Sequence, residues 1–225
     1  MDSKIIVMLT HNDRTVANAL EVFESCKDLP IDFWGFKDVG LAQPEMAALI
    51  AAMKRAGKTT FLEVVSYSEE ECLKGAMLAV ELGFDYLMGT LYYPSVWAYL
   101  NHKPIRYLPF VGKVSGSPSI LEGSIGFMIG EMLRFKELGI PGVDILSYRY
   151  VGDPVSLTRD FVDAADECQV VMAGSIGSRE QLETVNGINP FAFTMGSALF
   201  TGTFVEGGVR ENLEEVLRLM AAIHT

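Results

Sequence analysis

Cysteine is scarce in this chain, and its distribution gives no sign of disulfides. The three cysteines, Cys26, Cys72 and Cys168, fall in stretches with helical periodicity and show no C-x-x-C spacing. An odd number of isolated cysteines is typical of reduced, structural thiols. We therefore expect a cytoplasmic protein.

Long apolar runs are also lacking. The most apolar stretch, from Ser124 to Leu133, is too short to cross a bilayer and contains Glu131. The N-terminal residues lead directly into a predicted strand at Lys4, without the pattern of a signal peptide. We expect no association with a membrane.

Positive charge is the third deficiency. The chain has 18 lysines and arginines against 29 acidic residues, a net charge of −11. Nucleic-acid binding requires clustered lysine and arginine, so we expect no nucleic-acid partner. A small phosphorylated metabolite remains compatible, because backbone amides and one or two lysines suffice to bind a phosphate.

Short apolar runs alternate with longer amphipathic runs along the whole chain. The predicted strands cover about residues 4–9, 33–37, 60–65, 86–88, 105–111, 144–148, 170–173 and 192–195. The predicted helices cover about residues 15–27, 43–56, 68–82, 94–101, 120–138, 154–167, 179–185 and 209–223. Eight such pairs without a linker predict one (β/α)₈ TIM barrel, an α/β domain spanning residues 1–225. A doubly wound open sheet is the alternative, although the first β–α turn lacks its glycine fingerprint.

The segment covering residues 169–200 carries the clearest functional pattern. Each of its two apolar runs ends in a Gly-Ser pair. Parallel strands end at the same edge of a barrel, so the free backbone N–H groups that follow are expected to form an anion-binding nest. Phosphate binds at the loops after strands seven and eight in many such barrels. The predicted phosphate-binding residues are Gly174, Ser175, Ile176, Gly196, Ser197 and Ala198.

A single carboxylate interrupts the third predicted strand. Glu63 has apolar residues on both sides, and a buried carboxylate can serve as a general base or acid. Lys37 ends the neighbouring strand and could polarise a carbonyl group or form a Schiff base. The alternatives are a buried Glu63–Lys37 pair that only stabilises the barrel, or an exposed turn pair of Lys37 with Asp38.

Further candidates lie at other predicted strand ends. His11 could be catalytic or a turn residue bonded to the backbone, and Lys113 could act from a mobile loop or be solvated. Arg149 could clamp an anionic ligand or form an ion pair. Asp38 and Thr90 are predicted substrate contacts. We expect no metal or other cofactor, because no second histidine follows a strand and no ligand spacing is present.

The sequence AGSIGSREQLETV, followed by GSALFTGTF, resembles the end of the ribulose-phosphate-binding barrels. This superfamily includes the histidine- and tryptophan-biosynthesis isomerases, the pentulose-phosphate epimerases and the N-acylmannosamine-6-phosphate epimerases. The similarity is strong over about 35 residues and loose over the eight-unit layout. It implies the barrel fold and a phosphate held by Gly174, Ser175, Gly196 and Ser197.

Other motifs of that superfamily are missing. Thr10-His11 stands where the histidine-pathway isomerases carry an aspartate, and Phe36-Lys37-Asp38 only partly matches the DxKxxD run of the decarboxylase branch. Tyr148 and Arg149 occupy the region of the strand-6 lysine of class I keto-acid aldolases. The resemblance therefore implies a fold and a phosphate site but no particular reaction.

Together the patterns predict an enzyme that acts on a small phosphorylated sugar or polyol. Isomerisation or epimerisation by proton transfer is the favoured reaction, with Glu63, Lys37, His11 and Lys113 as catalytic candidates. A Schiff-base aldolase or lyase using Lys37 or Lys113 is one alternative. The other is a regulator that senses a phosphorylated metabolite without catalysis. The sequence is compatible with a homo-oligomer.

Overall fold

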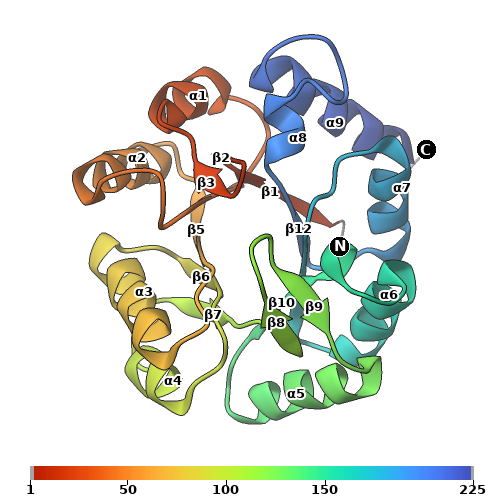
Figure 1. Cartoon of the computed structure of the whole chain (residues 1–225). Helices are drawn as coiled ribbons and strands as arrows, with labels where there is room; N and C mark the ends of the chain where they lie inside the picture. Colours follow the sequence, from red (N-terminus) through yellow and green to blue (C-terminus); the bar gives the residue numbers. More distant parts are fainter. Residues whose placement is uncertain (1–2, 224–225) are drawn as a thin grey trace.

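A computed structural model describes residues 3–223, and in this range eight parallel strands form a barrel surrounded by helices (Figure 1). The strands follow one another around the barrel in the order β10-β11-β12-β1-β4-β5-β6-β7. The ring closes beyond β7, where Phe110 forms a parallel bridge with Asp144 and the Asp144 N–H donates to the Pro109 carbonyl at 3.0 Å. The predicted (β/α)₈ barrel is confirmed, and the open-sheet alternative is wrong.

The elements alternate as the sequence pattern predicts. The barrel strands are β1 (Lys4–Met8), β4 (Phe33–Lys37), β5 (Thr59–Val64), β6 (Tyr86–Gly89), β7 (Arg106–Leu108), β10 (Gly142–Leu146), β11 (Gln169–Ala173) and β12 (Ala192–Met195). The helices are α1 (Ala19–Cys26), α2 (Gln43–Arg55), α3 (Glu69–Leu82), α4 (Pro94–Leu100), α5 (Ile125–Glu137), α6 (Pro154–Ala165), α7 (Arg179–Ile188), α8 (Ser197–Phe200) and α9 (Val209–Ile223). Within residues 3–223, none of these helices combines the length and apolar character needed to cross a membrane.

Short elements at the strand ends were not predicted. They are the hairpin of β2 (Thr10–His11) with β3 (Arg14–Thr15), the hairpin of β8 (Lys113–Ser115) with β9 (Ile120–Glu122), and the 3₁₀ turn η1 (Ser147–Arg149). Two helices consequently begin later than predicted. Residues 15–18 precede α1 because the chain reverses at Asn12 and Asp13, whose φ angles are 50° and 59°. Residues 120–124 precede α5, whose first turn is capped by Ser124.

Local sequence features mark both ends of several helices in the structure. Ser68 is the N-cap of α3, and its hydroxyl accepts a hydrogen bond from the Glu71 N–H at 3.3 Å. Gly57, Gly83 and Gly139 each follow a helix with φ between 72° and 86°. A residue with a Cβ would be strained in that left-handed conformation, which explains why glycine marks these helix ends.

The barrel interior contains an apolar cluster that is separate from the core between the strands and the helices. Phe61 is central to it, stacking on Tyr86 at 4.3 Å between ring centroids and contacting Phe33 at 5.1 Å. Side chains alternate across a strand, so Lys37 and Glu63 follow Phe33 and Phe61 on the interior face of β4 and β5. The cluster consists of Ile6, Met8, Phe33, Phe61, Tyr86, Met88, Leu108, Val171 and Ala192.

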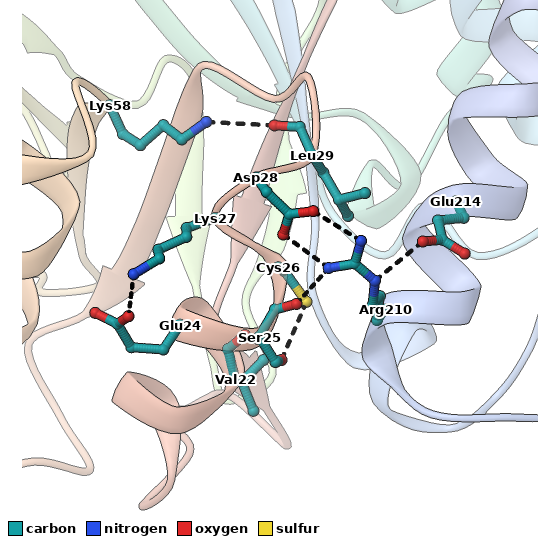
Figure 2. Close-up of polar contacts among 10 residues, drawn as sticks. All are labelled: Val22, Glu24, Ser25, Cys26, Lys27, Asp28, Leu29, Lys58, Arg210 and Glu214. Atoms are coloured by element: carbon teal, nitrogen blue, oxygen red, sulfur yellow. Dashed lines mark hydrogen bonds and ion pairs between the residues drawn. The ribbon is translucent and has the colours of Figure 1, made fainter.

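An exposed ion-pair cluster joins α1 to α9 (Figure 2). The Arg210 guanidinium donates to both carboxylate oxygens of Asp28, at 2.8 and 2.9 Å, and pairs with Glu214 at 3.0 Å. It also donates to the Ser25 carbonyl. The cluster therefore links the first and last helices of the ring around the barrel (Figure 1).

Candidate active site

A cavity of about 160 Å³ opens at the C-terminal ends of the barrel strands. Its lining combines the charged ends of β4 and β5 with the glycine-containing loops that follow β11 and β12. The remaining walls come from β1, the β2–β3 hairpin, the end of β10, η1 and the tip of the β8–β9 hairpin. The principal lining residues are Thr10, Asp13, Lys37, Glu63, Ser119, Arg149, Gly174, Ser175, Ile176, Gly177, Thr194, Gly196, Ser197 and Ala198.

Lys37 lies between two carboxylates at this cavity. Its Nζ donates to Asp13 Oδ1 at 3.0 Å and lies 3.9 Å from Glu63 Oε2. Thr15 fixes the Lys37 backbone, because its hydroxyl accepts from the Lys37 N–H at 3.0 Å and donates to the Lys37 carbonyl at 2.7 Å. The β2–β3 hairpin thus supplies both Asp13 and Thr15 to hold the end of β4.

The environment of Lys37 keeps its amine protonated. Burial by itself would lower the pKa of Lys37, but the charge of Glu63 and the hydrogen bond to Asp13 outweigh it, so the pKa is raised. Burial by itself would raise the pKa of Asp13. The hydrogen bond from Lys37 and the charges of Lys37 and Arg149 outweigh it, so the pKa of that carboxyl is below its usual value. The site therefore holds an ammonium–carboxylate pair at neutral pH.

A second interior carboxyl, Asp144, was not identified as a candidate from the sequence. Its side chain is fully buried, and neither oxygen has a hydrogen-bond partner among the residues described. The backbone of Gly89 approaches it without hydrogen-bond geometry. Burial, reinforced by the charge of Glu63, raises the pKa of Asp144 well above its usual value, which favours the neutral acid. The available signal was a charged residue inside the apolar strand GVDIL, the same pattern that identified Glu63.

The two glycine loops provide unpaired backbone donors at the cavity. Gly174 and Ser175 have φ angles of 100° and 75°, so the chain bends sharply after β11. In the described part of the chain, the N–H groups of Ser175 and Ile176 donate to no protein acceptor. Ser197 and Ala198 form the first turn of α8, where N–H groups have no partner within the helix.

The two loops lie close to one another and to Arg149. A Cβ placed on Gly177 would lie 3.3 Å from the Ala198 Cβ, and one on Gly174 would lie 3.1 Å from the Arg149 Cγ. The Arg149 side chain, 22% exposed, lies 3.6 Å from Asp13 through its Nη2. A positively charged side chain therefore borders the unpaired N–H groups, an arrangement suited to an anion.

The structure places the other predicted residues outside this cavity. His11 packs near Phe200, with 6.2 Å between ring centroids, and Lys113 pairs with Glu122 across the β8–β9 hairpin with 74% of its side chain exposed. Thr90 is buried and shares a 2.7 Å hydrogen bond with the Tyr107 hydroxyl. Asp38 lines a neighbouring groove, where burial raises its pKa. Residue 224, a histidine, lies outside the described range.

Across residues 3–223, no group of three or more histidine, cysteine, aspartate or glutamate side chains is arranged to hold a metal ion. The chemical groups at the cavity are thus an ammonium, a guanidinium, carboxylates and backbone amides.

Solved structures share this fold at low sequence identity. No protein-family model and no curated protein matches the chain in sequence. Orotidine 5'-phosphate decarboxylase from Pyrococcus horikoshii superposes with a TM-score of 0.71 and 13% identity, covering 98% of this chain and 99% of that one. Thiamine phosphate pyrophosphorylase from Pyrococcus furiosus superposes with a TM-score of 0.68 and 14% identity, covering 99% of this chain and 97% of that one. A native KDPGal structure superposes with a TM-score of 0.70 and 11% identity, covering 98% of this chain and 95% of that one. The closed-barrel fold implied by the resemblance to the ribulose-phosphate-binding barrels is confirmed by these similarities.

Proposed function

We propose that the protein is an enzyme that transfers a proton next to the carbonyl group of a small phosphorylated sugar, as an isomerase or epimerase. The observation that carries this proposal is one cavity that brings together the Lys37–Glu63 pair and the unpaired N–H groups of both glycine loops. The loops and Arg149 would hold the phosphate. The carbonyl end of the substrate would then lie at Lys37 and Glu63.

Glu63 is the proposed base, and Lys37 is the proposed oxyanion stabiliser. The Glu63 carboxylate takes a proton from the carbon next to the carbonyl, and the C–H electron pair forms a C=C bond. The carbonyl π electrons move to oxygen, giving an enediolate beside the Lys37 ammonium, 3.9 Å from Glu63. The adjacent hydroxyl proton shifts to that oxygen, and return of the first proton to the other carbon completes an isomerisation.

The charge of Lys37 favours this reaction over a Schiff-base lyase. A Schiff base needs an unprotonated amine, whereas the raised pKa of Lys37 keeps the amine protonated. A protonated lysine is the form that stabilises an enediolate. Two of the proteins that share this fold, orotidine 5'-phosphate decarboxylase and thiamine phosphate pyrophosphorylase, carry a phosphate ester in their names. This supports a phosphorylated substrate without specifying the reaction.

A two-stage experiment tests the proposal. First, a thermal-shift panel of aldose and ketose phosphates identifies a ligand that raises the melting temperature, because a ligand of the folded state stabilises it by mass action. Second, that ligand is incubated with the protein in D₂O and examined by mass spectrometry and NMR. We expect deuterium at the carbon next to the carbonyl. Borohydride trapping at Lys37 would instead establish a lyase, and binding without labelling or trapping would establish a sensor.

A further inference from the structure

A second hollow, here called the outer groove, adjoins the cavity and has a volume of about 560 Å³. The two share four lining residues, Asp13, Lys37, Val65 and Ser119. The outer groove is therefore continuous with the cavity across the Lys37–Asp13 pair. From there it extends along α3 as far as Leu78, and its lining residues include none from the two glycine loops.

The walls of the outer groove are held by specific hydrogen bonds. The Tyr67 hydroxyl donates to the Gly116 carbonyl at 2.9 Å and shares a 2.7 Å hydrogen bond with the Ser119 hydroxyl. The Tyr93 hydroxyl in turn donates to the Tyr67 carbonyl at 2.7 Å. The tip of the β8–β9 hairpin is thus tied to the connection between β5 and α3.

The outer groove is lined by apolar side chains and by carboxylates, which are here called its acidic rim. Val39, Val65 and Leu78 supply apolar surface. Asp38 and Glu71 supply carboxylates, which accept hydrogen bonds and repel anions. The basic side chains that line the groove, Lys37 and Lys74, already have carboxylate partners. Lys37 is held by Asp13 and Glu63, and Lys74 pairs with Glu70 at 2.6 Å.

We infer that the outer groove binds the distal part of the substrate, and that this part is a neutral or cationic ring with hydrogen-bond donors rather than a second phosphate. The inference rests on the proposed anchoring of a phosphate at the glycine loops. With the phosphate there and the carbonyl at Lys37, the continuous hollow leads the remaining substrate over the Lys37–Asp13 pair. The apolar side chains of the groove would then pack against one face of the ring, and the carboxylates of the acidic rim would accept hydrogen bonds from the N–H or O–H groups of the ring.

The inference predicts a ranking of affinities by isothermal titration calorimetry. The probes are inorganic phosphate, ribose 5-phosphate, cytidine 5'-monophosphate, pyridoxamine 5'-phosphate and fructose 1,6-bisphosphate. We expect the two ring-bearing monoesters to bind on the order of tenfold more tightly than ribose 5-phosphate, because a ring face is removed from water. The bisphosphate should bind more weakly than ribose 5-phosphate, because its second phosphate meets the acidic rim.

A matched pair of variants on α3 separates the groove from the phosphate site. Leu78→Trp fills the groove. It should abolish the higher affinity of the ring-bearing probes while leaving the affinity for ribose 5-phosphate unchanged. Met77→Trp adds the same side chain at a position that is 50% exposed and outside the groove lining, and should change neither affinity. Circular dichroism and the melting temperature of both variants verify that they are folded.

The outcomes distinguish the two proposals. The groove inference is overturned, with the phosphate site intact, if ribose 5-phosphate binds but both ring-bearing probes bind no more tightly, or if Leu78→Trp leaves their affinity unchanged. If neither inorganic phosphate nor any phosphate ester binds, the proposed function fails, and the groove inference fails with it.

Discussion

The lower and upper layers of the barrel interior are built on the same strands from different kinds of residue. On β4 and β5, Phe33 and Phe61 occupy the lower positions, whereas Lys37 and Glu63 occupy the upper ones. The lower layer packs aromatic rings against one another and against Tyr86. The upper layer keeps charges beside a cavity. The comparison teaches that one pair of strands carries apolar packing below and charge above, so under the proposed function mutations in the two layers should have different consequences.

The largest expected effect is on turnover, in the upper layer. Glu63→Gln keeps the shape of the side chain but removes its ability to accept a proton, so turnover should fall by ~10²–10⁴-fold with little change in affinity. Steady-state kinetics measures the change in turnover, with the sugar phosphate that the labelling experiment identifies as the substrate. Glu122→Gln, on the β8–β9 hairpin outside the cavity, is the control and should retain full turnover. A loss of stability with unchanged turnover per folded molecule would identify Glu63 as a structural partner of Lys37.

The matching change in the lower layer should affect stability alone. Phe61 is fully buried, and Phe61→Ala should lower the free energy of unfolding by ~3–5 kcal/mol, because it removes stacked contacts and leaves a cavity. Urea denaturation measures this loss. Phe127→Ala, at a position that is 61% exposed, should change the value by less than ~0.5 kcal/mol. Weaker phosphate binding by the folded Phe61→Ala protein would show that the layers are coupled.

A third variant tests the anion site at the top of β12. Ser197→Asp places a negative charge beside the unpaired N–H groups and should weaken binding of the sugar phosphate by at least about tenfold, because like charges repel at short range. Titration calorimetry measures the affinity. Ser178→Asp adds the same charge at the N-cap of α7, outside the cavity lining, and retains a capping side chain. Equal affinities in the two variants would refute the phosphate assignment.

Asp144 allows the effect of a buried carboxyl on the pH dependence of stability to be tested. Because its pKa is raised in the folded state, the folded protein binds more protons than the unfolded chain between about pH 4 and the folded pKa of Asp144. Its contribution therefore makes stability fall as pH rises from about 4 toward the folded pKa. Asp144→Asn should remove this decline, by up to about 1.4 kcal/mol per pH unit. Urea denaturation from pH 5 to pH 8 measures the difference, and parallel pH profiles would contradict it.

The smallest effect is expected outside the barrel, at the cluster of Figure 2. The hydrogen bonds from Arg210 lower the pKa of Asp28 to about 2. The associated stability is present above the unfolded pKa of about 4 and is lost as pH falls through about 2. Asp28→Asn should lower the melting temperature slightly at pH 7, because exposed ion pairs contribute little. The difference should shrink in 1 M salt, and an effect insensitive to salt would contradict an electrostatic origin.

Much of the fold followed from short-range patterns. Apolar runs and amphipathic periods gave the order of the barrel elements, since burial on one or both faces imposes those periods wherever the strand lies. Glycines at helix ends follow the same rule, because φ is a local property. The predicted helix starts at residues 15 and 120 were wrong for the opposite reason. Residues 10–15 and 113–122 pair as hairpins through contacts that no periodic pattern encodes.

For the candidate site, the sequence determined which strands end in reactive residues, because parallel strands in a closed barrel must end on one edge. It thereby indicated Lys37, Glu63 and the two glycine loops. Only the tertiary structure decided that Asp13 pairs with Lys37, that Asp144 is buried without a hydrogen-bond partner in residues 3–223, and that His11 and Lys113 lie away from the cavity. These outcomes depend on how a turn directs a side chain and on which distant segments close the ring, and both are settled by packing between residues far apart in the chain.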